Sequence, residues 1–323
     1  MRFYHVYTKG LEDRLIFRTT DDFVAGMNYV AIVHFKVRVK LLAFVLMSNH
    51  VHFAIGGSEE DVWKFINLYK RLISVYITNK YHDAAFLRRI VTNCDEVSVK
   101  DDGLKRLIAY ILDNPVNAGV NRVAFAYHWG SATCYFSNKP DKATSISSLS
   151  IRAQRHILHS NVMLPDTYLL GPEGYILPHS YVDVQFVENH FGRPKSLEYF
   201  LCVSASSRKL RKDVVMFSDD IIRQAMNELL INKYGVPSFH NLEFDLQVNL
   251  IRELRSHFNV SAKQIARLTG FASLSTRTTP CICEQNEIPA ISLGSMPVSA
   301  STFFVVLQIA AHHSEGICSA EPS

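Results

Sequence analysis

Two histidines separated by a single residue are the first feature of this sequence that could carry chemistry. His50 and His52 flank Val51 in the segment LMSNHVHF, which has the pattern of a β-strand. Side chains alternate between the two faces of a strand, so we expect both imidazoles on one side and Val51 in the core behind them. Paired imidazoles suit several first-row divalent metal ions. The alternative is a surface strand that carries two histidines by chance, and the spacing alone leaves it open.

A tyrosine and an asparagine four positions apart form the second feature. Tyr110 and Asn114 lie in LKRLIAYILDNPVNAG, where residues four apart on a helix become neighbours. A divalent ion beside a phenol stabilises the phenolate and so activates it as a nucleophile. Asn114 offers an amide oxygen as a third metal ligand. The alternative is that Tyr110 packs at the edge of an apolar stripe, and Pro115 is expected to stop the helix.

Strands and helices are mixed through about the first 137 residues. Strands are expected at 3–8, 41–47, 50–55 and 86–91, and helices from 21 or 22 to about 35, at 59–80, and from 101 or 102 to 115. Ser48 and Asn49 are expected to form a tight turn between two of the strands. A mixture of this kind predicts an α+β fold.

The two motifs, in this order and about 60 residues apart, resemble the single-tyrosine HUH transposases. More narrowly, they resemble the insertion-sequence 200-like group and the REP-associated tyrosine transposases. The opening FYHVYTKG and the segment YHWGSATCYF are similar to other recurring stretches of that family. The resemblance covers about residues 1–137, and the paired motifs are specific to it.

The resemblance implies a catalytic domain at 1–137 with a ferredoxin-like antiparallel sheet and helices on one face. It implies that His50 and His52 bind Mg²⁺ or Mn²⁺ with Asn114 as auxiliary ligand. Tyr110 would be the nucleophile that cuts single-stranded DNA through a 5′-phosphotyrosine and frees a 3′-OH. The expected partners are single-stranded or hairpin DNA and a second copy of the chain. The family commonly has a basic residue where this chain has Asn117, and a glycine-containing segment where it has FLRRI.

Beyond residue 137 the sequence changes character. The polar stretch 138–150 is expected as a linker, 151–275 as a helical accessory region, and 276–323 as an irregular tail. Helices are expected at 219–232 and 244–257, and Ser261 is expected to cap a further helix. The helix at 244–257 and the helix capped by Ser261 outline the first two helices of a helix-turn-helix module. A third helix should begin near Phe271, where ASLSTRTTPCIC is poor helix material. A helical region without DNA contact is the alternative.

The net charge of +4 permits a polyanionic partner without requiring one. Basic residues on the long helix, near the expected strand at 86–91 and in the densest basic cluster are candidates for DNA contact. They are Lys64, Lys70, Arg71, Arg88, Arg89, Arg208, Lys209, Arg211 and Lys212. A solvated charged surface is the alternative for each group.

Six scattered cysteines and an N-terminus without the apolar core of a signal peptide predict reduced thiols and a cytoplasmic location, near the bacterial nucleoid if DNA is the partner. The longest apolar run is too short for a membrane span. Cys281 and Cys283 do not have the usual spacing of zinc ligands.

Three other classes of protein are alternatives to this interpretation. A DNA-binding regulator that keeps the fold but no longer cuts is the main one. A histidine-triad hydrolase or transferase needs a third alternating histidine, and Ala54 stands in that place. A structural zinc site would need further ligands, for which His5, His34 and Cys94 are the candidates.

Overall fold

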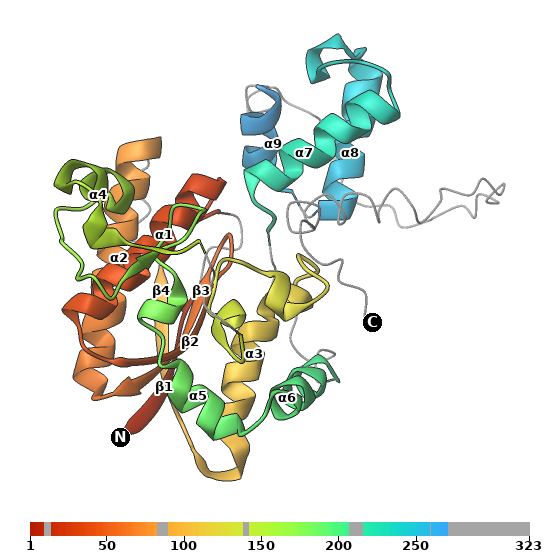
Figure 1. Ribbon diagram of the computed structural model, residues 1–323. Coiled ribbons are helices and arrows are strands. Elements are labelled where there is room, and N and C mark those ends of the chain that lie inside the picture. The colour runs from red at the N-terminus through yellow and green to blue at the C-terminus, as the bar shows by residue number, and fades with distance from the viewer. Residues whose placement is uncertain (10–13, 83–89, 138–141, 207–215, 259, 271–323) are drawn as a thin grey trace, which may run out of the picture. The chain divides into compact units, whose positions relative to one another are not determined.

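The computed structural model describes residues 1–9, 14–82, 90–137, 142–206, 216–258 and 260–270 (Figure 1). The chain divides into two compact units, Met1–Ile222 and Arg223–Ser323. Each unit is described by itself. No helix among the described residues combines the length and the apolar composition that crossing a membrane requires.

The first unit is built on a four-stranded antiparallel sheet with the strand order β2-β3-β1-β4 (Figure 1). The strands are β1 (Arg2–Lys9), β2 (Lys40–Leu46), β3 (Val51–Gly57) and β4 (Val91–Val97). Helix α1 (Thr20–Lys36) connects β1 to β2, and α2 (Glu59–Tyr81) connects β3 to β4. The Met47 N–H donates to the carbonyl of His50 at 2.8 Å, which closes the tight turn expected at Ser48 and Asn49. The α+β class is confirmed.

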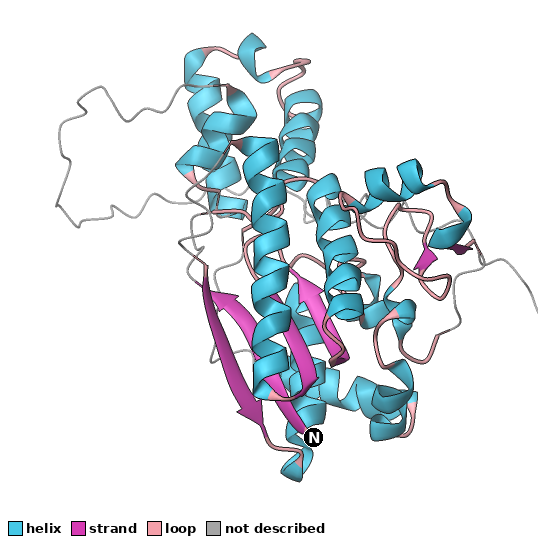
Figure 2. Ribbon diagram, turned by 90° about the vertical axis from the view of Figure 1, so that its left-hand side faces the viewer, coloured by secondary structure: helices cyan, strands magenta, loops and turns pink. Residues whose placement is uncertain are grey.

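Helices cover both faces of this sheet. On β3, Phe53 meets the rings of Phe65 and Tyr69 on α2 at 5.5 and 5.3 Å between centroids; we call this side the Phe53 face. His52 points to the opposite side, the His52 face, where it meets Tyr110 of α3 (Gly103–Asn117). Figure 2 shows long helices in front of the sheet. The expectation of helices on one face was therefore wrong.

The reason for this double cover lies in the sequence of the central strands. All residues of β2 and β3 are buried except the outermost residue of each, Lys40 and Gly57, which are partly buried. Strands that are apolar on both sides need a packing layer on each face. The continuous apolar run at 41–47 contains this signal, because it lacks the alternation of a half-exposed strand.

The fourth strand lies later in the chain than expected. The apolar pattern predicts a strand at 86–91, whereas β4 spans Val91–Val97, and residues 83–89 lie outside the described ones. Strand β4 pairs only with β1 and forms an edge of the sheet. Its residues are exposed or only partly buried, so no apolar pattern marks it.

Pro115 does not stop helix α3, which continues to Asn117. Although Pro115 has no N–H to donate, the Ala118 N–H still reaches the carbonyl of Asn114 at 3.0 Å. The helix ends where Gly119 adopts φ +70, a conformation that costs glycine little. Asn114 therefore keeps its helical position one turn after Tyr110.

The segments after residue 142 continue the first unit. They comprise β5 (Thr144–Ser145), α4 (Ile151–Leu158), β6 (Leu169–Leu170), α5 (Val184–Phe191) and α6 (Pro194–Ser206). Asn28 of α1 holds them: its amide nitrogen donates to the carbonyls of Ile157 and Gly174, and its oxygen accepts from Ile176 N–H at 2.8 Å. Residues 142–150 of the stretch expected as a linker lie in this unit, and the division between the units lies after Ile222.

The second unit is helical in its described part. Helix α7 (Asp219–Asn232) continues into it, followed by α8 (Phe244–Phe258) and α9 (Ala262–Thr269). The Ser261 hydroxyl accepts from Gln264 N–H at 3.2 Å, so Ser261 is the N-cap that the sequence predicts. The expected third helix near Phe271 and the tail at 276–323 lie outside the described residues.

A buried carboxylate ties helix α1 to helix α2. The fully buried Asp22 accepts from the backbone N–H groups of Arg18 and Thr19 at 2.8 and 3.0 Å. It also accepts from the Tyr81 hydroxyl and from Lys80 Nζ, both at 2.7 Å. With four donors around one carboxylate, the start of α1 is fixed against the last turn of α2.

Asp22 is fully buried, whereas the Lys80 side chain is 30% exposed. Removing the lysine leaves the buried carboxylate without its counter-charge, so Lys80→Met is expected to lower the free energy of unfolding by about 1 to 3 kcal/mol. The matched control is Lys64→Met on the same helix, where an exposed lysine pairs with Glu60 at 2.7 Å. The control is expected to leave the urea midpoint nearly unchanged. Equal midpoints for the two variants would contradict the structural role of the Asp22 carboxylate.

Candidate functional site

The two histidines of the HVH motif lie at the start of β3 on the His52 face. Their ring centroids are 4.9 Å apart and the rings are nearly perpendicular, at 89°. Both are buried, with exposed fractions of 8% for His50 and 3% for His52. Val51 between them is buried as well, as the alternation predicts.

Helix α3 brings the second motif to the same place. The ring of Tyr110 stands edge-on to His52, with 5.6 Å between centroids and an angle of 89°. One turn later, the Oδ1 of Asn114 lies 3.3 Å from Nε2 of His50. The structure therefore brings His50, His52, Tyr110 and Asn114 together within one copy of the chain.

His50 lies within hydrogen-bonding distance of two amide oxygens. Its Nδ1 lies 2.8 Å from the Oδ1 of Asn49, and an amide oxygen only accepts, so Nδ1 donates. A neutral His50 then directs a lone pair from Nε2 toward the oxygen of Asn114. Two facing lone pairs are stabilised by a shared proton or by a shared cation.

The second ring nitrogen of His52 is in a similar situation. Nδ1 of His52 contacts Nε2 of His5 at 3.0 Å, whereas its Nε2 is buried without a hydrogen-bond partner among the described residues. Burial, followed by the neighbouring imidazoles of His50 and His5, holds the pKa of His52 well below its usual 6.5. His52 is therefore neutral at pH 7, the form that binds a metal ion.

These groups fit a divalent cation. No group of three or more His, Cys, Asp or Glu side chains in the described part of the chain is arranged to hold a metal ion. The set at this site is instead two imidazole nitrogens and one amide oxygen. Mn²⁺ and Mg²⁺ accept such a set together with water or phosphate oxygens. The buried Nε2 of His52 and the facing lone pairs of His50 and Asn114 would all be satisfied by one such ion.

Strand β1 contributes two residues, His5 and Tyr7, that the sequence did not predict at this site. His5 and Tyr7 stack at 4.5 Å between centroids, and Tyr7 lies 5.6 Å from His52. The amide of Asn93 donates to the Tyr7 hydroxyl at 3.0 Å. The alternation in FYHVYTKG puts His5 and Tyr7 on one face, but only the pairing of Tyr7 with His52 places them at the site.

Three of the basic residues proposed for DNA contact are described, and all three lie on helix α2, away from this site. Lys70 of α2, on the Phe53 face, donates to the carbonyl of Ile90 and to Thr92 Oγ1 at 3.0 and 2.9 Å. Lys64 pairs with Glu60, and Arg71 is exposed on the same helix. The remaining candidates lie outside the described residues: Arg88, Arg89, Arg208, Lys209, Arg211 and Lys212.

Comparison with known proteins brings no match: no family model, no curated protein and no solved structure matches the chain. The interpretation of the site thus rests on its geometry and on the motifs of the sequence.

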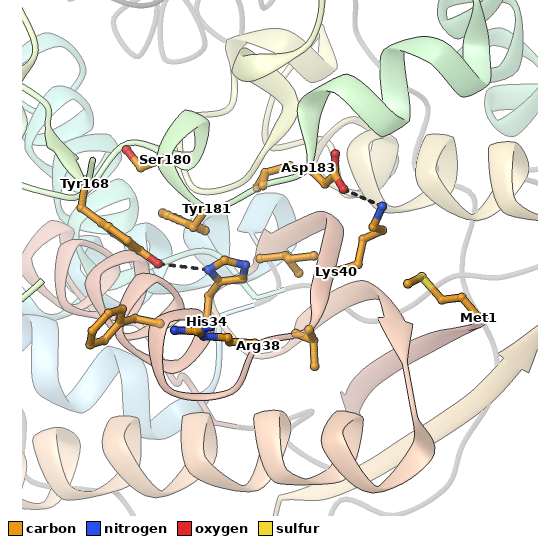
Figure 3. Close-up of a pocket in the computed structure, with 12 residues that line it drawn as sticks. Met1, His34, Arg38, Lys40, Tyr168, Ser180, Tyr181 and Asp183 are labelled. Carbon is orange, nitrogen blue, oxygen red and sulfur yellow. Dashed lines mark hydrogen bonds and ion pairs between the residues drawn. The ribbon is translucent and has the colours of Figure 1, made fainter. Parts of the chain in front are cut away.

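A hollow of about 590 Å³ lies at the other end of the β2–β3 hairpin (Figure 3). Lys40 at its rim pairs in register with Gly56, whereas His52 pairs with Val45. Figure 3 shows that its polar groups contact each other, with His34 Nδ1 3.1 Å from the Tyr168 hydroxyl and Lys40 Nζ 2.9 Å from the Asp183 carboxylate. The hollow is separate from the His52 site. Besides these two pairs, its lining includes the buried Tyr181 hydroxyl, which has no hydrogen-bond partner among the described residues.

His34 gives the stability of the first unit a dependence on pH. Burial lowers the pKa of His34 below its ordinary 6.5. The unfolded chain therefore takes up this proton at a higher pH than the folded chain does. The stabilisation is complete above pH 6.5 and is lost as the pH falls through the lowered pKa. We expect His34→Gln to reduce the loss of stability between about pH 7 and about pH 5, measured by urea midpoints. Parallel curves for the two proteins would contradict this.

Proposed function

We propose that this chain cuts and rejoins single-stranded DNA with Tyr110 as the nucleophile and a divalent metal ion as cofactor, in the manner of the single-tyrosine HUH transposases that it resembles. One observation carries the proposal. The Tyr110 ring stands edge-on to His52 at 5.6 Å, beside a His50–Asn114 pair whose polar atoms are 3.3 Å apart. A phenol, two imidazoles and an amide oxygen from segments about 60 residues apart thus share one site.

The architecture supports a ferredoxin-like HUH nuclease domain. The succession β1-α1-β2-β3-α2-β4 and the strand order β2-β3-β1-β4 are those expected of a ferredoxin-like sheet, and they support this proposal. Many unrelated functions share this fold, so it adds to the proposal only together with the site.

The chemistry is a transesterification. The oxygen of Tyr110 attacks the phosphorus of the scissile phosphodiester, and its proton passes to solvent. A bond forms between this oxygen and the 5′ phosphate, while the bond to the 3′ oxygen breaks and that oxygen leaves as a 3′-OH after taking up a proton. Attack by a 3′-OH on the phosphotyrosine reverses these steps and frees the phenol. The energy of the phosphodiester is conserved throughout, so rejoining needs no nucleotide cofactor.

The surrounding residues hold and orient the reacting groups. His50, His52 and Asn114 would hold Mg²⁺ or Mn²⁺, which neutralises charge that develops on the phosphate oxygens. His52 is neutral because burial lowers its pKa, so its lone pair is available at pH 7. Tyr110 is only partly buried. In the proposed reaction a strand of DNA would approach its hydroxyl from solvent.

The proposal extends to the partners. The substrate is single-stranded DNA or a DNA hairpin, handled by a homodimer in the cytoplasm close to the nucleoid. Helices α8 and α9 would supply part of a helix-turn-helix in the second unit. The rival is a regulator that binds the same DNA without cutting it.

Tyr110→Phe is expected to lower the yield of the covalent protein–DNA adduct by at least about 1000-fold, because the attacking oxygen is removed. The assay incubates the protein with a labelled single-stranded hairpin and Mn²⁺, and follows the adduct on a denaturing gel. Tyr7→Phe is the matched control, since Tyr7 is a second phenol beside His52 whose hydroxyl already binds Asn93.

The control is expected to keep most of the adduct. An adduct that survives in Tyr110→Phe, or that is lost only in Tyr7→Phe, would reject Tyr110 as the nucleophile. If the wild-type protein binds the hairpin but forms no adduct with Mn²⁺, the regulator is the better description.

His50→Ala and Asn114→Ala are each expected to weaken Mn²⁺ binding by at least about 10-fold, measured by isothermal titration calorimetry. The control is His34→Gln, which replaces a partly buried histidine of helix α1 at the separate hollow and should bind Mn²⁺ like the wild type. Chelation with EDTA should abolish the adduct, and added Mn²⁺ should restore it. Unchanged Mn²⁺ affinity in both alanine variants would show that the ion, if bound, lies elsewhere.

A further inference from the structure

A third imidazole contacts the metal-ligand candidates from the neighbouring strand. His5 on β1 lies on the His52 face, and its ring is nearly parallel to that of His52, at 5.2 Å and 16°. Nε2 of His5 and Nδ1 of His52 are 3.0 Å apart. This contact joins two residues that are 47 positions apart in the chain.

This contact can hold one proton, on either Nε2 of His5 or Nδ1 of His52. The nitrogen that carries the proton determines what His52 can bind. A neutral imidazole carries a single N–H. If His5 donates, then His52 has its own N–H on Nε2, which is buried without an acceptor among the described residues. If His52 donates, then its Nε2 keeps a lone pair, and a cation can satisfy that lone pair.

We infer that His5 is a positioning residue that accepts the Nδ1 proton of His52 and so leaves the His52 lone pair on Nε2. This inference rests on the proposed function, in which Nε2 of His52 is a metal ligand. Ligand histidines generally donate their other N–H to an acceptor, usually a carboxylate, a backbone carbonyl or water, and this sets both the tautomer and the orientation of the ring. At this site the atom within reach is Nε2 of His5.

The surroundings of His5 support this role, because they fix its ring in place. One side stacks on Tyr7 at 4.5 Å, and the Tyr7 hydroxyl is in turn bound by Asn93 of β4. His5 also stands edge-on to Tyr110, at 5.7 Å and 81°. A line of contacts therefore runs from β4 through β1 to β3, and the same imidazole touches both His52 and the ring of the nucleophile.

The test compares wild-type protein with His5→Phe, which keeps a ring against Tyr7 but removes the acceptor, and His5→Gln, which restores one. The first measurement uses metal-free protein at neutral pH. Long-range ¹H–¹⁵N correlation spectra report which nitrogen of His52 carries the proton. We expect the Nδ1–H tautomer in the wild type and in His5→Gln, and its loss in His5→Phe. His34, bound to Tyr168, is the internal reference and should not change.

The second measurement is Mn²⁺ affinity by calorimetry. His5→Phe should weaken binding by about 10- to 100-fold, and His5→Gln should recover most of the loss. An Nε2–H tautomer of His52 in the wild type would overturn the inference, and this spectrum decides even if His5→Phe does not fold. Unchanged Mn²⁺ affinity in a folded His5→Phe would overturn it as well. The expected tautomers in a protein that forms no DNA adduct would support the role of His5 and reject the strand-transfer function instead.

Discussion

The alternation of side chains along β3 is the constraint on which the site depends. Val51, Phe53 and Ile55 point to the Phe53 face, where Phe53 meets the aromatic rings of α2, while His52 points to α3. A slip of one residue in the pairing of β3 would send the imidazole into that aromatic cluster and a phenylalanine to the site. Apolar packing on the Phe53 face therefore determines the position of the His52 imidazole on the opposite face.

The cover on the His52 face makes the polar groups of the site costly unless something binds them. His50, His52 and Asn114 are buried, and burial removes the water that would otherwise satisfy Nε2 of His52. Core positions of this kind are normally filled by apolar residues, as they are on the Phe53 face. The presence of buried polar groups with an unsatisfied nitrogen is the departure from ordinary packing that marks a functional site.

The sequence predicts most of the elements because periodicity is local, but it predicts contacts only where the residues are close in the chain. Helix α2 and the turn at Ser48 and Asn49 could be predicted from local sequence patterns. Strand β4 could not, since an edge strand needs no apolar pattern, and the stretch 138–150 is polar although the residues after it pack into the same unit. The convergence of the two motifs followed from the family resemblance rather than from spacing. The contact of His5 with His52 depends on the register of β1 against β3, which no local pattern encodes.

The face on which a lysine lies determines whether it can contact a phosphate beside Tyr110. Lys70 is occupied at the β4 edge on the Phe53 face, and Lys64 pairs with its own helix, so α2 cannot hold a strand whose phosphate lies beside Tyr110. On the His52 face, Lys9 stands over the ring of Tyr7 at 4.9 Å. With a net charge of only +4, the chain has no strong overall attraction for a polyanion. Among the groups that the structure describes, the ion between His50, His52 and Asn114 would be the main one to hold the phosphate in the proposed reaction. Binding of DNA at the site would then depend on binding of the metal ion.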